Sequence, residues 1–175
     1  SILLVGAFSN TVYANPPRVN VVDQTALGLL WMQDGAEYKG MVHQAFNAVK
    51  REVKEEKGTK GIFIRIDDVL LDNTPYVAWL LEKDEEDTPE NRKRWYRSLD
   101  SEAVDGALEL MEFLRERDDV EVMLVTSRTR DVLGATARNL EKAGFIGLTR
   151  EDMIKEEDLD SYIKNGGDYT VILTN

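Results

Sequence analysis

The chain has 175 residues, contains no cysteine and carries a formal net charge of −11. This length suits one domain with a single core, and hydrophobic and charged fractions of 42% and 31% are ordinary for a globular protein. The lack of cysteine excludes disulfides, zinc–thiolate sites and thiol nucleophiles. The acidic balance argues against binding to nucleic acids or anionic membranes, because both need clustered lysine and arginine.

The N-terminal residues are typical of the end of a secretory signal. An apolar stretch at 2–8 precedes Val12-Tyr13-Ala14, which places a small residue where a signal peptidase cuts. We therefore expect residues 1–14 to be a signal-peptide remnant, 15–21 to be a linker, and the protein to be secreted, periplasmic or on the cell surface. A short N-terminal strand or helix is the alternative. The sequence contains no stretch of the ~20 apolar residues that a membrane span needs.

Apolar patterning predicts strands that alternate with helices along the rest of the chain. In order, these are an amphipathic helix at 34–57 that ends at Gly58, a strand at 62–66, a helix at 103–117, a strand at 120–125, a helix at 131–143 and a strand at 169–173. Between them we expect a loop around Pro75, an acidic loop at 82–90 and a weakly helical region at 149–164. This order predicts an α/β, Rossmann-like fold, with a mostly parallel sheet, helices on both faces and an N-terminal helical segment.

Polar side chains follow the first two predicted strands. They are Arg65, Asp67, Asp68 and Asp72 after the first strand, and Thr126, Ser127 and Arg128 after the second. Because the carboxyl ends of parallel strands lie side by side, we expect these residues to converge on one crevice. Hydroxyls and N–H groups at a helix start suit a phosphate, although Thr and Ser at such a junction are also ordinary helix caps.

Several short motifs occur in a fixed order from about Leu30 to the end of the chain. They are Trp31-Met32-Gln33, Ala36-Glu37-Tyr38-Lys39, Gln44-Ala45-Phe46-Asn47, Leu71-Asp72-Asn73-Thr74-Pro75-Tyr76 with Trp79, Arg94-Trp95, Gly106-Ala107 and Val125-Thr126-Ser127-Arg128. Together they resemble the haloacid dehalogenase (HAD) superfamily, specifically the subfamily IIIB, class C acid phosphatases and their lipoprotein 5′-nucleotidase relatives. The resemblance implies an HAD-type domain at 22–175, with a small cap-like insertion around 75–102.

The resemblance also implies a chemistry, namely Mg2+-dependent hydrolysis of phosphate monoesters such as nucleoside monophosphates. In that family one aspartate attacks phosphorus, and a second aspartate two residues later acts as acid and base. Matched by position, Asp67 is the second aspartate and a weak Mg2+ ligand through its backbone carbonyl. The expected phosphate-binding residues are Arg65, Thr126, Ser127, Arg128 and Lys155, with Lys164 as an alternative to Lys155. The expected substrate-pocket residues are Asp72, Tyr76, Trp79 and Trp95, of which the aromatic ones are equally compatible with a core role.

The sequence departs from the family pattern at the nucleophile, where Arg65 stands. Val69 replaces a usual threonine, and the printed sequence stops at Thr174-Asn175, where the family continues into Gly-Asp-Asn; we therefore expect a C-terminally incomplete domain. Loss of a covalent nucleophile lowers kcat by about a millionfold in a well-studied hydrolase.

These departures predict a phosphatase-like pseudoenzyme that binds a small-molecule phosphate or phosphomonoester. The alternative is an active Mg2+-dependent acid phosphatase or 5′-nucleotidase in which Asp67 or Asp68 substitutes for the nucleophile. Arg65 has two expected roles: a metal-independent anion site with Thr126 and Ser127, or an ion pair with Asp67 or Asp72.

Overall fold

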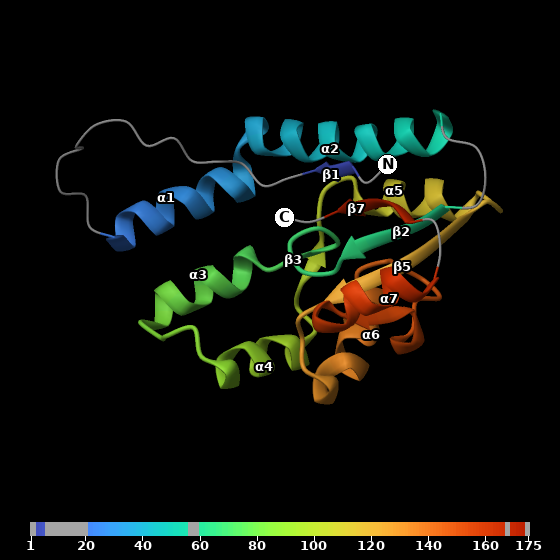
Figure 1. Cartoon of the computed structure of the whole chain (residues 1–175). Helices are drawn as coiled ribbons and strands as arrows, with labels where there is room; N and C mark the ends of the chain where they lie inside the picture. Colours follow the sequence, from blue (N-terminus) through green and yellow to red (C-terminus); the bar gives the residue numbers. More distant parts are fainter. Residues whose placement is uncertain (1–2, 6–20, 56–59, 167–168, 174–175) are drawn as a thin grey trace.

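In the computed structural model, which describes residues 3–5, 21–55, 60–166 and 169–173, a five-stranded sheet forms the centre (Figure 1). Its strands, in the order β1-β7-β2-β5-β6, are β1 (Leu3–Val5), β7 (Tyr169–Leu173), β2 (Lys60–Arg65), β5 (Val120–Thr126) and β6 (Met153–Lys155). All neighbouring pairs in this sheet are parallel. Parallel strands need crossover connections, and the predicted α/β class with a mostly parallel sheet is confirmed.

Helices supply the crossovers and the layers around the sheet. They are α1 (Val21–Asp34), α2 (Ala36–Glu55), α3 (Thr74–Lys83), α4 (Pro89–Ser98), α5 (Ala107–Arg115), α6 (Leu133–Lys142) and α7 (Leu159–Gly166). Single 3-10 turns form η1 (Arg130–Val132), η2 (Arg150–Asp152) and η3 (Glu156–Asp158). A separate two-stranded antiparallel sheet joins β3 (Leu71–Asp72) to β4 (Glu102–Ala103).

Alternating side chains of β2 place apolar groups on both faces of the sheet. Ile62 and Ile64 are fully buried in a core cluster that also holds residues of α2 and α5. Phe63 points to the opposite face, where it meets Tyr162 of α7 edge-on, with 5.9 Å between the ring centroids. Burial on both faces explains why this strand is apolar throughout, and the predicted helices on both faces are confirmed.

Two predicted loops contain helical residues. Pro75 lies in the first turn of α3, where a missing backbone N–H does no harm. The acidic run at 82–90 spans the end of α3, a connection with Asp84 in the left-handed conformation (φ 52°), and the start of α4. Helix α4 was not predicted, because its sequence is almost wholly polar and shows no apolar periodicity. The side chain of Thr88 caps its N-terminus by accepting a hydrogen bond from the Asn91 N–H at 3.1 Å.

Two further predictions needed smaller corrections. The helix expected at 103–117 is shorter, because Glu102–Ala103 pairs as β4 and Gly106 (φ 81°) turns the chain before α5 begins. The weakly helical region at 149–164 contains β6, which adds an edge strand beside β5, and α7.

The N-terminal segment is described only in part. Leu3–Val5 forms β1 beside β7, while most of the predicted signal remnant and linker, like Gly58, lies outside the described residues. The signal-peptide interpretation stays a prediction. Within the described part of the chain, no helix has both the length and the apolar character needed to cross a bilayer.

Helices α1, α3 and α4 lie beyond the carboxyl end of β2 (Figure 1). Helices α3 and α4 lie almost entirely within the segment 75–102, for which the family resemblance implies a small cap-like insertion. That interpretation stays a prediction. This side of the sheet is where parallel α/β proteins generally bind their ligands.

Candidate functional site

A cavity of about 690 Å3 lies at the carboxyl end of β2. Its floor includes Arg65, Asp67, Asp68 and Ser127, and its walls come from α1, α3 and α4. The predicted convergence of strand-end residues is therefore observed for these four side chains. A volume of this size is in the usual range for small-molecule sites, about 300–1,000 Å3.

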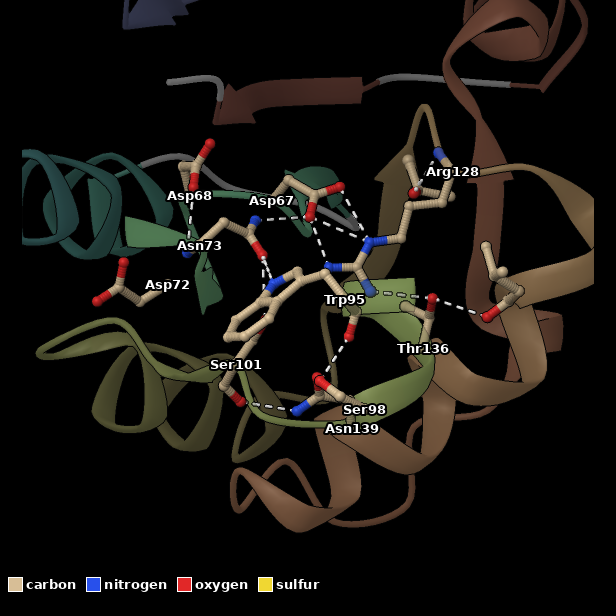
Figure 2. A network of polar contacts seen from close by, with 12 residues as sticks. Asp67, Asp68, Asp72, Asn73, Trp95, Ser98, Ser101, Arg128, Thr136 and Asn139 are labelled. Atoms are coloured by element: carbon tan, nitrogen blue, oxygen red, sulfur yellow. Dashed lines mark hydrogen bonds and ion pairs between the residues drawn. The ribbon is translucent and has the colours of Figure 1, made fainter. Parts of the chain in front are cut away.

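Asp67 is held by Arg128 in the middle of a polar network (Figure 2). Arg128 donates from Nε to both carboxylate oxygens, at 3.0 and 3.2 Å, and from a terminal nitrogen to Oδ1 at 2.6 Å. Another terminal nitrogen of Arg128 donates to Thr136 Oγ1 at 3.1 Å, and the guanidinium lies 3.9 Å from the ring centre of Tyr96. The side chain of Arg128 is completely buried.

This enclosure changes the role expected for Arg128. Its guanidinium was predicted to bind phosphate, but its hydrogen bonds go to Asp67 and Thr136 and its side chain is shielded from solvent. A buried arginine needs such partners, since an unpaired buried charge costs several kcal/mol. We therefore assign Arg128 to holding Asp67 in place.

Asn73 connects the same carboxylate to the segment 75–102. Its amide nitrogen donates to Asp67 Oδ1 at 2.8 Å, and its carbonyl oxygen accepts from Trp95 Nε1 at 3.0 Å and from Ser101 Oγ at 3.1 Å. Figure 2 shows Asn73 between Asp67 and Trp95. One amide thus links the loop after β2 to α4, which fixes the cavity floor relative to one wall.

The two other aspartates near the floor differ in role. Asp72 binds the first residue of α3, because its carboxylate accepts from the Thr74 N–H at 2.8 Å and from the Thr74 hydroxyl at 3.0 Å. Asp68 has a left-handed backbone (φ 61°) and lines the cavity. Burial, the charge of Asp67 and, to a smaller extent, that of Asp72 raise the pKa of Asp68, against the opposing effect of hydrogen bonds from Asn73.

Arg65 forms its ion pair with Glu156, which lies in η3 after β6. The distance from Nη2 to Oε1 is 2.5 Å, and about a quarter of the Arg65 side chain is exposed. The expectation that Arg65 pairs with Asp67 or Asp72 named the wrong partner, because the Asp67 carboxylate binds Arg128 and the Asp72 carboxylate binds Thr74.

The residues after β5 and on β6 divide into a cavity-lining hydroxyl and supporting groups. Ser127 is exposed and lines the cavity, whereas Thr126 is 1% exposed and its Oγ1 accepts from the Arg128 N–H at 3.0 Å. Lys155 donates to the backbone carbonyls of Arg128 at 2.6 Å and Thr126 at 3.5 Å. Lys155 therefore holds the loop after β5, and its predicted contact with phosphate stays a prediction.

The predicted aromatic residues lie around two neighbouring cavities. Tyr76 lines the large cavity and also a second one of about 260 Å3, whose lining includes Trp79 and Trp95. The Tyr76 ring stacks on Trp79 with 6.2 Å between centroids and is 5.9 Å from Trp95. Of these three aromatic residues, Tyr76 lines the same cavity as the floor residues, whereas Trp95 is connected to the floor through its hydrogen bond to Asn73.

Sequence reasoning missed several residues of the cavity wall. Leu29 and Met32 of α1 and Val77 and Leu80 of α3 are among them. Leu29 and Met32 precede β2 by more than 25 positions, and only the packing of α1 beside α3 brings them to the cavity. Their apolar character was visible in the sequence, but apolar residues in a helix more often indicate an ordinary core.

Asp87 and Arg92 were also missed, and they form a paired group with Tyr76. The Tyr76 hydroxyl donates to Asp87 Oδ1 at 2.8 Å, and Arg92 donates to both oxygens of the same carboxylate. The Arg92 hydrogen bonds lower the pKa of Asp87, and burial together with the bond to Asp87 raises the pKa of Tyr76.

The donors at this floor do not suit Mg2+, the cofactor that the sequence resemblance implies. Mg2+ prefers carboxylate and other oxygen ligands, whereas Arg65 presents a cation at the predicted nucleophile position. The Asp67 carboxylate already accepts hydrogen bonds from Arg128 at both oxygens. In the described part of the chain, no group of three or more histidine or carboxylate side chains is arranged to hold a metal ion.

Comparison with known proteins identifies relatives of the whole domain. A family model described as HAD superfamily, subfamily IIIB (Acid phosphatase) matches residues 8–165. The crystal structure of the class C acid phosphatase from Bacillus anthracis with tungstate bound is similar, with a TM-score of 0.77 and 22% sequence identity over 88% of this chain and 69% of that one. A second structure of the class C acid phosphatase from Bacillus anthracis gives a TM-score of 0.75 and 22% identity over 85% and 66% of the respective chains. These structures establish a shared fold, and the chain spans about two thirds of their length.

Proposed function

Because the chain belongs to the HAD superfamily, subfamily IIIB (acid phosphatase), we propose that it binds phosphate monoesters at the carboxyl end of β2 and is impaired in their hydrolysis. The observation that carries this proposal is the guanidinium of Arg65 on the floor of the large cavity. A guanidinium binds a phosphate through two parallel hydrogen bonds, and it has only donors, so it cannot attack phosphorus.

Arg65 has the surroundings that an anion site needs. It is the last residue of β2 and is in register with Val125 of β5, two residues before Ser127. The exposed Ser127 hydroxyl lines the same cavity. Arg65 already binds an oxyanion, the carboxylate of Glu156, and about half of that glutamate side chain is exposed. We expect a phosphate to compete with Glu156 for the guanidinium. The relative from Bacillus anthracis with tungstate bound supports the choice of a tetrahedral oxyanion.

The state of Asp67 supports impaired hydrolysis. In the acid–base role that the family implies, this carboxyl group would have to exchange a proton with the leaving group. Here Arg128 donates to both of its oxygens and Asn73 donates to one. Using Asp67 as a substitute nucleophile would require breaking this buried ion pair.

An active Mg2+-dependent acid phosphatase or 5′-nucleotidase is the second candidate, and Asp68 favours it. Asp67 and Asp68 both line the cavity, but the Asp67 carboxylate is bound by Arg128 at both oxygens, so Asp68 is the preferred replacement for the nucleophile.

We also propose export to the periplasm, the cell surface or the medium, based on the N-terminal sequence. N-terminal sequencing of the protein recovered from each compartment tests it.

Calorimetric titration of inorganic phosphate, with EDTA present, tests phosphate binding. We expect millimolar or tighter binding that is lost in Arg65→Ala and weakened but retained in Arg65→Lys. The matched control is Arg97→Ala, which removes an exposed arginine that pairs with Asp131 and does not line the cavity. No heat from the unmodified protein, or equal binding by Arg65→Ala, would refute the anion site.

Hydrolysis of p-nitrophenyl phosphate with Mg2+ separates the two candidates. We expect no turnover above background from the purified protein. Robust turnover that disappears in Asp68→Asn, with Arg97→Ala still active, would establish the second candidate and overturn the proposed impairment.

A further inference from the structure

The large cavity combines a charged floor with an apolar wall. The floor holds Arg65, Asp67 and Asp68, at the carboxyl end of β2. The wall that α1 and α3 provide is formed by the aliphatic side chains of Leu29, Met32, Val77 and Leu80. Figure 1 shows these two helices beside each other, and they are in contact. A phosphate monoester bound at the floor would therefore have its alcohol portion next to hydrocarbon.

Four polar residues of the cavity lining, Asn73, Tyr76, Asp87 and Arg92, already have hydrogen-bond partners within the protein. Tyr76 and Arg92 both donate to the carboxylate of Asp87. The side-chain amide of Asn73 has partners at both ends, since it donates to Asp67 and accepts from Trp95 and Ser101. A nucleobase needs donors and acceptors for its ring and exocyclic atoms, and these four side chains can supply them only by giving up the hydrogen bonds that they already make.

Because the cavity has a charged floor and an aliphatic wall, we propose that it prefers a phosphate monoester of an aliphatic alcohol over a nucleoside monophosphate. The inference rests on the proposed function, because it takes the phosphate to bind at Arg65. The alkyl chain lies against Leu29, Met32 and the α3 residues, where it displaces water from apolar surface. Each methylene that is fully buried there raises affinity by roughly fourfold, the equivalent of ~0.8 kcal/mol.

A homologous series of ligands measures this preference directly. We would titrate the full chain, with EDTA present, with inorganic phosphate, methyl phosphate, butyl phosphate, hexyl phosphate and adenosine monophosphate. Affinity is expected to rise steadily with chain length, so that hexyl phosphate binds at least tenfold more tightly than methyl phosphate. Adenosine monophosphate is expected to bind more weakly than hexyl phosphate.

Two leucines of α1 provide a matched pair of variants. Leu29 lines the cavity and is half-buried, whereas Leu27 is 63% exposed and does not line it. Leu29→Asn is expected to lower the affinity for hexyl phosphate about tenfold and to leave that for inorganic phosphate unchanged. Leu27→Asn, the same substitution two residues away on the same helix, is expected to change neither. Because neither leucine belongs to the buried core, both variants are expected to fold.

The outcomes separate this inference from the function on which it rests. If inorganic and methyl phosphate do not bind, the phosphate site itself is refuted and the inference falls with it. If they bind but affinity stays flat along the series, or adenosine monophosphate binds more tightly than hexyl phosphate, the aliphatic preference alone is refuted. Equal loss of hexyl phosphate affinity in Leu27→Asn and Leu29→Asn would also overturn it.

Discussion

Replacing Arg128 by methionine removes the group that holds Asp67 at the cavity floor. The substitution keeps an unbranched apolar stem of similar length, but it removes three contacts to the Asp67 carboxylate and one to Thr136. The Arg128 side chain is completely buried, and that of Asp67 is only 18% exposed. The variant therefore leaves a largely buried carboxylate that has lost two hydrogen bonds at Oδ1, one at Oδ2 and its compensating cation.

The expected loss of stability follows from this burial. Breaking a buried ion pair by removing one partner costs about 3–5 kcal/mol. We expect about 3 kcal/mol, the lower end, because the partly exposed Asp67 regains some hydration and keeps its hydrogen bond from Asn73. A typical domain is stable by only about 5–15 kcal/mol. In a chain of this size the loss corresponds to a fall in Tm of roughly 6–12 °C.

Urea and thermal unfolding measure this loss, and two comparisons show its origin. Arg97→Met removes an arginine whose ion pair with Asp131 is exposed, so it is expected to cost at most about 1 kcal/mol. Asp67→Asn in the Arg128→Met background is expected to cost less than it does alone, with a coupling energy of about 2 kcal/mol. A loss from Arg128→Met no larger than that from Arg97→Met, or strict additivity in the double variant, would refute the structural role of this pair.

Three further substitutions test other parts of the site. Burial and the charge of Asp67 raise the pKa of Asp68 above its ordinary 3.8, so ionisation of Asp68 opposes folding at neutral pH. Asp68→Asn should therefore raise the urea midpoint at pH 7. This gain should disappear as the pH falls to 3.8 and below, where Asp68 is protonated in both the folded and the unfolded state. Thr88→Ala removes the side-chain cap of α4 and should cost about 1 kcal/mol in urea unfolding, whereas an unchanged midpoint would show that the cap is dispensable. Glu156→Gln removes the carboxylate bound to Arg65 and should raise phosphate affinity several-fold by calorimetry; an equal or lower affinity would show that the two anions do not compete.

Local patterns in the sequence were sufficient for the fold class and for the floor of the site. The apolar run of β2 is buried on both faces, and such a run is readable without tertiary information. Since parallel strands end at one edge of a sheet, the convergence of Arg65, Asp67 and Ser127 on one cavity followed from their positions after two strands.

Such patterns could not predict helix α4 or the part of the cavity wall that α1 provides. The sequence of α4 has few apolar residues, and its position depends on tertiary contacts such as the hydrogen bond from Trp95 to Asn73. Leu29 could be recognised as apolar, but whether it faces a core or a cavity depends on how α1 packs against α3.

The amino-acid sequence alone determined which charged groups stand at the strand ends. That Arg65 stands at the nucleophile position is a prediction from the family resemblance. Only the tertiary structure decided how those charges pair. Arg128 reaches Asp67 across 61 positions, and Arg65 reaches Glu156 across 91. Ion-pair partners depend on distances of a few ångströms between side chains, and these distances are set by the packing of whole strands and helices.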